Sequence, residues 1–212
     1  MEPSFSPAAS GPRAATPPRP APWSLLGIGA APLVMALLGL MHPGGLTPAT
    51  AHHWTLLHLG LIPLFPLIGV NLWWLLSGVP GPWAWLARAG AFLYAAYYPA
   101  VDLLAGVAAG RLVDLGVDRD STAVRELFRQ ANTLGDVGDY ALLAACVLAL
   151  VALWPALGAR ILPGGAALLV GAWLFTEHHI YPPLGVTGML LLAVAFVWLL
   201  ALWQRARRSF PA

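Results

Sequence analysis

Six apolar segments, each long enough to cross a lipid bilayer as a helix, constrain the fold of this chain more than any other feature. A bilayer core about 30 Å thick requires a helix of about 20 apolar residues. In chain order the segments cover residues 23–42, 53–77, 83–109, 140–157, 161–178 and 184–204. Only 9% of the 212 residues are charged, against roughly 25% in a soluble domain. The sequence therefore predicts an all-α integral membrane protein, a six-transmembrane-helix bundle.

The rest of the chain leaves no room for a separate soluble domain. We expect one membrane domain over residues 23–205. Residues 1–22 are rich in Pro and Ala and predict a disordered cytoplasmic tail, and residues 206–212 predict a short cytoplasmic tail. Three prolines inside the spans should kink their helices because each removes a backbone donor: Pro63, Pro66 and Pro99.

The only long polar stretch is residues 110–137, between the third and fourth spans. Asp120 or Ser121 can cap a helix there, and Gly135 can end it. Apolar residues between these positions recur at helical spacing. We therefore predict a short amphipathic helix in a long outer loop, which either lies among the lipid headgroups or covers an outward-facing pocket.

The distribution of arginine predicts the orientation, because short cytoplasmic loops carry an excess of basic residues. All eleven basic residues are arginine. With both termini in the cytoplasm, seven lie inside and four, all in the 110–137 loop, lie outside. We expect the plasma (inner) membrane of a bacterium. The arginines form no continuous patch, which argues against nucleic acid; the expected partners are membrane lipid, a lipid-like substrate and other membrane subunits.

Ionisable residues gather at one face of this topology. Every histidine and every acidic residue except Glu2 lies in the outer half or in an outer loop. A charged group inside a bilayer costs about 2.5 kcal/mol or more and normally faces a partner in the bundle interior. His58, Asp102 and the Glu177–His178 pair lie within about 10 Å of the outer interface at 1.5 Å per helical residue. We therefore predict an outward-facing cluster of His, Asp and Glu.

The residues of this predicted site have different roles. The expected metal ligands are His53, His58, Asp102, His178 and His179, with Asp102 and Glu177 as catalytic groups. The supporting residues are Tyr94 and Tyr98, which share a helical face with Asp102, and Asp136 and Asp139, which also suit helix capping. Consecutive helical residues point about 100° apart. We therefore expect Glu177 or His178 to face inward and His179 to lie in the headgroups, and we place His42 and His52 at the interface.

Three chemistries suit such a cluster. Imidazoles and carboxylates with an open position suit a Zn-like transition metal that activates water, here for hydrolysis of a lipid-like substrate. Histidines from two spans suit a b-type haem in a redox membrane protein. Without a cofactor, histidines titrating near pH 6.5 suit the proton-responsive polar core of a transporter, sensor or assembly partner. The accompanying carboxylates favour the Zn-like metal over haem, and the lone Cys146 rules out a CxxC redox pair.

Overall fold

The computed structural model describes residues 22–209, and all regular structure in this part of the chain is helical. The first elements are α1 (Pro22–Gly39), α2 (Ala51–Leu61), α3 (Phe65–Leu75) and α4 (Pro82–Tyr97). They are followed by α5 (Pro99–Val101), the π-helix η1 (Asp102–Ala108) and α6 (Ala109–Asp114). The last are α7 (Thr122–Leu157), the 3₁₀-helix η2 (Gly158–Ile161), α8 (Leu162–His178) and α9 (Leu184–Ser209). The predicted tail at residues 1–22 lies almost entirely outside the described residues, as do the last three residues of the predicted tail at 206–212.

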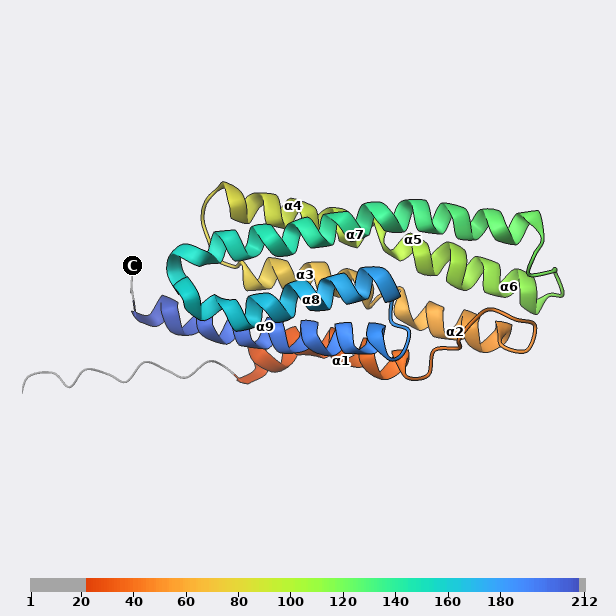
Figure 1. Cartoon of the computed structure of the whole chain (residues 1–212), viewed down its shortest axis with the longest axis horizontal. Helices are drawn as coiled ribbons and strands as arrows, with labels where there is room; N and C mark the ends of the chain where they lie inside the picture. The colour runs from red at the N-terminus through yellow and green to blue at the C-terminus, as the bar shows by residue number, and fades with distance from the viewer. Residues whose placement is uncertain (1–21, 210–212) are drawn as a thin grey trace, which may run out of the picture.

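Four helical runs in the described part are long and apolar enough to cross a membrane: Ala51–Leu75, Pro82–Asp114, Thr122–His178 and Leu184–Arg207. The helix Trp23–Gly39 is also apolar but shorter. These lengths and compositions indicate an integral membrane protein. The run Thr122–His178 is too long for one crossing, and it folds back at η2 so that α7 and α8 form a hairpin (Figure 1).

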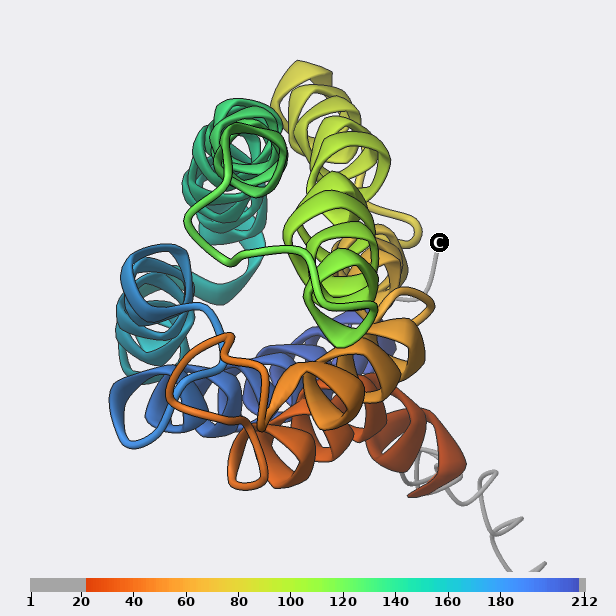
Figure 2. The ribbon, with the colours of Figure 1, turned by 90° about the vertical axis from the view of Figure 1, so that its right-hand side faces the viewer.

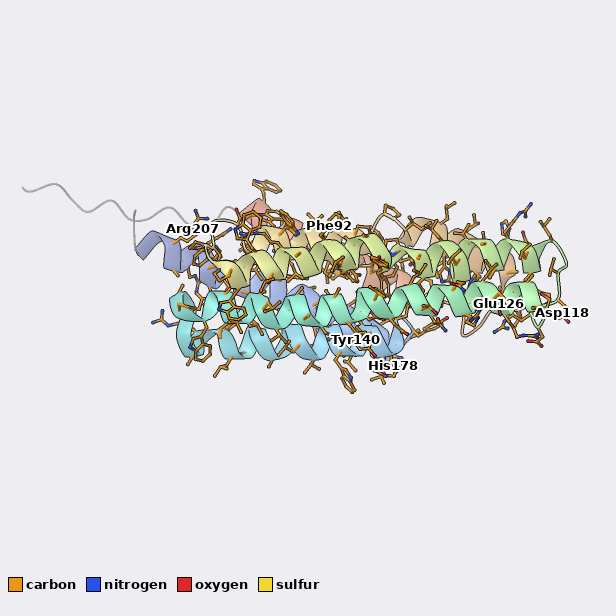
Figure 3. All side chains as sticks on the ribbon, turned by 90° about the horizontal axis from the view of Figure 1, so that it is seen from above. Phe92, Asp118, Glu126, Tyr140, His178 and Arg207 are labelled. Carbon is orange, nitrogen blue, oxygen red and sulfur yellow. The ribbon has the colours of Figure 1, made fainter. Side chains whose placement is uncertain are left out.

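The long helices lie side by side along one axis, and the first and last described residues lie at the same end of the bundle (Figure 1). The end view in Figure 2 shows helices from the beginning, middle and end of the chain arranged around that axis. Asp118 and Glu126 lie at one end and Arg207 at the other, with Phe92 and Tyr140 between them (Figure 3). Phe92 and Tyr140 are 63% and 74% exposed. A middle zone of exposed rings between charged ends suits a helix bundle surrounded by lipid.

The predicted proline breaks are confirmed. α2 ends at Leu61, and a turn containing Pro63 separates it from α3. α4 ends at Tyr97, just before Pro99 opens α5. The widened turns of η1 follow at once, and no sequence pattern predicted them. π-Helical turns often occur at functional sites.

The structure differs from the long outer loop predicted over residues 110–137. α6 continues to Asp114, so only residues 115–121 separate it from α7. Ser121 caps α7 by accepting a hydrogen bond from the Val124 backbone N–H. The predicted stop at Gly135 is wrong, since α7 continues unbroken to Leu157. The amphipathic segment is therefore the first part of α7, and its apolar face packs on α2 and α6 instead of on headgroups.

The same continuity corrects the capping role considered for two acidic residues. Asp136 and Asp139 lie well inside α7, 14 and 17 residues after its first residue, Thr122. Backbone N–H groups are free only in the first turn of a helix. These carboxylates therefore project from the middle of the helix, and Asp139 points into the bundle.

Candidate metal centre

Three histidines from distant parts of the sequence meet inside the bundle. His42 follows α1, His58 lies in the last turn of α2, and His179 directly follows α8. Each offers one ring nitrogen, and these three atoms lie within 4.8 Å of one another. His42 and His58 are only 6% and 3% exposed. This group, here called the three-histidine cluster, has the composition and spacing of a metal-ligand set.

Hydrogen bonds decide which nitrogen of two rings faces the cluster. Nδ1 of His42 lies 2.8 Å from the carbonyl oxygen of Pro43, and Nδ1 of His58 lies 2.7 Å from that of Trp54. A carbonyl oxygen only accepts, so in each ring Nδ1 carries the proton and donates. Each Nε2 is then left with a free lone pair, and the two Nε2 atoms face each other at 3.4 Å. Between neutral rings this contact is repulsive unless a cation or a proton lies between the two nitrogens.

The distance between these two atoms fits a metal ion. Zn–N bonds of about 2.0–2.1 Å at a tetrahedral angle separate two ligand nitrogens by about 3.3–3.4 Å. The observed separation of 3.4 Å matches that value. Metal-binding histidines also usually donate their other ring N–H to a carbonyl, carboxylate or water. His42 and His58 both make this second contact.

His179 joins the cluster from the end of α8. Its Nδ1 is hydrogen-bonded to the Tyr98 hydroxyl at 2.7 Å, while its Nε2 is buried and has no partner among the described residues. Its ring is parallel to that of His58, with 6.2 Å between centroids. When Nδ1 donates to Tyr98, Nε2 has a free lone pair and is available as a third ligand.

Backbone conformation explains why His179 points inward. The residue ends α8 with a φ of 50° and a ψ of −130°, a positive-φ conformation that is uncommon for residues other than glycine, although His, Asn and Asp adopt it more often than most. This turns its side chain out of the helical register of α8. The prediction that Glu177 or His178 faces inward and His179 lies in the headgroups assumed that register, and the structure has the opposite arrangement around the cluster.

The two histidines outside the candidate spans favour the neutral form. Burial lowers the pKa of His42, against the opposing effect of its hydrogen bond to Pro43. Burial, together with the neighbouring His58 and His42, lowers the pKa of His179 well below its ordinary value. Neutral imidazole is the form that binds a metal. A proton between the two Nε2 atoms is therefore less favourable than a metal ion there.

Aromatic rings enclose the cluster. Tyr181 packs edge-on against His42 with 4.1 Å between centroids, and Trp54 packs against His58 at 4.6 Å. Burial and the nearby Asp102 raise the pKa of Tyr181 to about 12, so its hydroxyl stays protonated. The Trp54 indole N–H donates to the Ala105 carbonyl in η1 at 3.0 Å. These contacts hold the π-helix against the cluster.

Gly106 in η1 makes the approach of α2 possible. A Cβ at this position would overlap the Cβ and ring atoms of His58. The absence of a side chain therefore allows the π-helix to lie directly against the imidazole. No periodicity in the sequence marks this glycine as part of the site.

Asp102 begins η1 and is fully buried, at 0% exposure. Neither carboxylate oxygen has a hydrogen-bond partner among the described residues. Tyr94, on the same face of this helical run, also has a buried hydroxyl without a described partner, and its ring stacks on Tyr98 with 5.3 Å between centroids.

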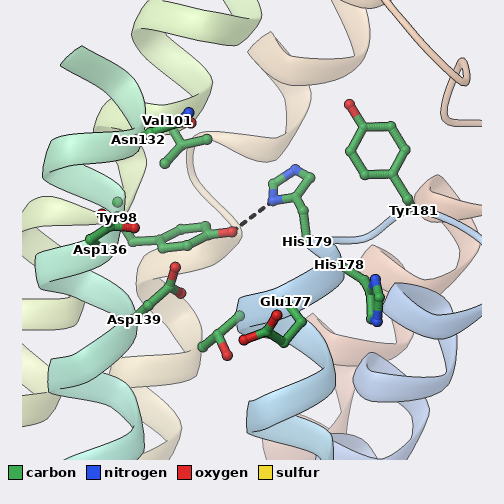
Figure 4. Close-up of a pocket in the computed structure, with 11 residues that line it drawn as sticks. Tyr98, Val101, Asn132, Asp136, Asp139, Glu177, His178, His179 and Tyr181 are labelled. Carbon is green, nitrogen blue, oxygen red and sulfur yellow. Dashed lines mark hydrogen bonds between the residues drawn. The ribbon is translucent and has the colours of Figure 1, made fainter. Parts of the chain in front are cut away.

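The other predicted site residues lie around the cluster instead of in it. His53 is exposed and its Nε2 is hydrogen-bonded to the Met41 carbonyl at 3.0 Å. A cavity of about 430 Å³ lies beside His179, and its lining includes Asp136, Asp139, Glu177 and His178. In Figure 4 the Asp139 and Glu177 side chains lie close to the Tyr98–His179 hydrogen bond. The cavity is therefore acidic and shares one wall with the cluster.

His42 is the member that sequence reasoning missed. Its position just after the first span suggested an interfacial histidine, because polar and aromatic residues are common there. The one available signal was its location at the same predicted membrane face as the other histidines. That His42 faces His58 is visible only in the three-dimensional structure.

No protein-family model, curated protein or solved structure matches this chain. The fold and the site together define its class: an all-helical membrane protein with a histidine cluster able to hold a metal ion.

Proposed function

We propose that this chain is a multi-pass membrane protein that binds a transition metal through His42, His58 and His179. The observation that carries the proposal is the pair of Nε2 atoms facing each other at 3.4 Å, with both Nδ1 atoms engaged by carbonyl groups. Three neutral imidazoles suit Zn²⁺ and its neighbours in the first transition row.

A set of three protein ligands leaves a fourth tetrahedral position open, as in catalytic zinc sites. A metal with an open position activates bound water for hydrolysis. The candidate spans that surround the cluster give apolar molecules the easiest access, so the substrate class we favour is a lipid-like molecule. Glu177 and the acidic cavity lie on one side of the cluster, where they can contact a bound substrate.

The geometry favours a small ion over the b-type haem considered from the sequence. Two axial histidines bind haem from opposite faces of a wide planar macrocycle, which needs a flat open gap around the line between their nitrogens. Here the facing nitrogens of His42 and His58 are 3.4 Å apart. The rings of Tyr181 and Trp54 pack directly on the same two histidines. The space around this pair suits one ion.

The proposal includes six crossings with both termini cytoplasmic and the site facing outward. The α7–α8 hairpin and the shared end of the first and last described residues support an even number of crossings. The arginine distribution supports the orientation. A cysteine placed at Asp118 in a Cys146→Ser background should react with a membrane-impermeant maleimide in intact cells. Labelling only after the cells are opened would reverse the orientation.

Metal binding is tested by titrating the purified, chelator-treated protein with Co²⁺ and by elemental analysis. We expect one metal per chain and the visible bands of tetrahedral cobalt with nitrogen ligands. The triple variant with alanine at the three cluster positions should bind no metal, whereas His53→Ala should behave as wild type. Wild-type protein that binds neither Co²⁺ nor Zn²⁺ would contradict the proposal and favour a proton-responsive polar core.

A further inference from the structure

Asp102 is the most costly buried group in the described part of the chain. It is fully buried, both of its oxygens lack a partner, and no ion pair among the described residues includes it. A carboxylate in such surroundings strongly disfavours its charged form unless a cation is close. A bound cation close to the carboxylate would supply the missing partner.

The residues one turn before and one turn after Asp102 lie against two of the three histidines. Tyr98, one helical turn before it, is hydrogen-bonded to His179 at 2.7 Å. Gly106, one turn after it, lies directly against the His58 ring.

Tyr181 packs on the remaining member of the cluster, His42. Asp102 thus lies on the helical run whose neighbouring residues contact His179 and His58. The π-helical turns that begin at Asp102 keep this face of the run against α2.

The net positive charge of the proposed site would also be stabilised by a nearby anion. Three neutral imidazoles around a divalent ion leave two positive charges buried in an apolar bundle. A carboxylate nearby offsets one of them without occupying the position of a histidine. Asp102 is nevertheless not one of the groups that come within 4.8 Å of each other. Asp102 is therefore not a direct member of the ligand group, and a small molecule would have to lie between the carboxylate and the metal.

We propose that Asp102 is the anionic partner of the metal centre and reaches the metal through a bound water molecule or another oxygen ligand that carries a proton. The inference rests on the proposed three-histidine metal site and specifies the ligand of its fourth position. The carboxylate accepts a hydrogen bond from that ligand. The fourth position therefore selects water or an alcohol, which can donate, and disfavours anions such as azide, which cannot.

The test compares wild type with Asp102→Asn in Co²⁺ titrations of chelator-treated protein, with azide added to the cobalt-loaded forms. We expect the variant to bind Co²⁺ about 10- to 100-fold more weakly, the usual effect of losing a group that hydrogen-bonds a ligand of the metal. We expect azide to bind the cobalt-loaded variant more tightly than wild type. The metal-free variant should unfold at the same or a higher temperature, because the amide has no charge to bury.

Asp114→Asn is the matched control, since it removes a carboxylate from the same helical run at a site paired with Arg111. It should leave Co²⁺ and azide binding unchanged. If Asp102→Asn keeps wild-type affinity, spectrum and azide response, the role of Asp102 is refuted while the histidine site stands. A metal-free variant that unfolds at a lower temperature would show a structural role instead. Wild type that binds no Co²⁺ would refute the histidine site, and this inference with it.

Discussion

Replacing His42 with alanine tests the structure most directly, because the sequence alone assigns this residue no part in a site. The structure makes its Nε2 one of two nitrogens that face each other at 3.4 Å. Alanine removes one of three proposed ligands and leaves the His58 lone pair without its counterpart. We therefore expect a large loss of metal affinity in a variant that still folds.

The size of the loss follows from the number of ligands. Structural zinc sites bind with about 10–16 kcal/mol of apparent free energy shared among four ligands, so one ligand contributes about 2.5–4 kcal/mol. At about 1.36 kcal/mol per tenfold change, removal of His42 should raise the dissociation constant about 10²- to 10³-fold. Truncating a residue that only hydrogen-bonds a metal ligand would give a smaller effect, about 10- to 100-fold.

The assay is competition between the protein and a colorimetric zinc chelator in detergent, with thermal unfolding of the metal-free variant as the check on folding. His53→Ala is the control, because this histidine is exposed and bonded to the Met41 carbonyl. It should change the dissociation constant by less than about twofold, well within the variation of surface contacts. Equal losses in the two variants, or wild-type affinity in His42→Ala, would refute the assigned geometry.

Three further outcomes are expected. Gly106→Ala should abolish metal binding, because the added Cβ would overlap the His58 imidazole on α2. Gly60→Ala is its control, since a Cβ at that position would have no atom within 4 Å. It should retain metal binding and stabilise its helix by about 0.5–1 kcal/mol. Tyr98→Phe should lose about 1–3 kcal/mol of stability, because it leaves the His179 Nδ1 unpaired, and it should weaken metal binding about 10- to 100-fold. Tyr97→Phe is its control, since Tyr97 is 39% exposed, and it should change neither stability nor metal binding. Acid should destabilise the metal-free protein, because burial lowers the pKa of His42 from 6.5: the unfolded chain takes up the proton first, so stability present above about pH 6.5 is lost as the pH falls. Unfolding temperatures between about pH 5 and 8 check this, and a rise toward acid pH would contradict it.

Much of the architecture could be predicted because it depends on local chemistry. A run of about 20 apolar residues has few stable alternatives to a membrane helix. Pro63 and Pro99 lack backbone donors, and the helices break beside both. The 110–137 segment was harder, since Ser121 caps the helix as predicted whereas Gly135 does not end it. Packing of α7 on α2 and α6 carries the helix through Gly135.

The site was only partly accessible from the sequence. His58 and His179 belonged to the predicted ligand set, and both lie in the cluster. His53 and His178 belonged to it as well, and they lie elsewhere. Helical register alone would turn His179 away, whereas a left-handed backbone turn brings it inward. Such a turn is set by the connection between α8 and α9, not by the residue itself.

The sequence by itself determined the class of protein, because hydrophobicity acts residue by residue along each span. Only the tertiary structure decided which of its polar groups meet. That choice depends on the rotation of each helix about its axis and on the close contact between Gly106 and His58. Both result from side chains packing across segments far apart in the chain, and no local pattern encodes them.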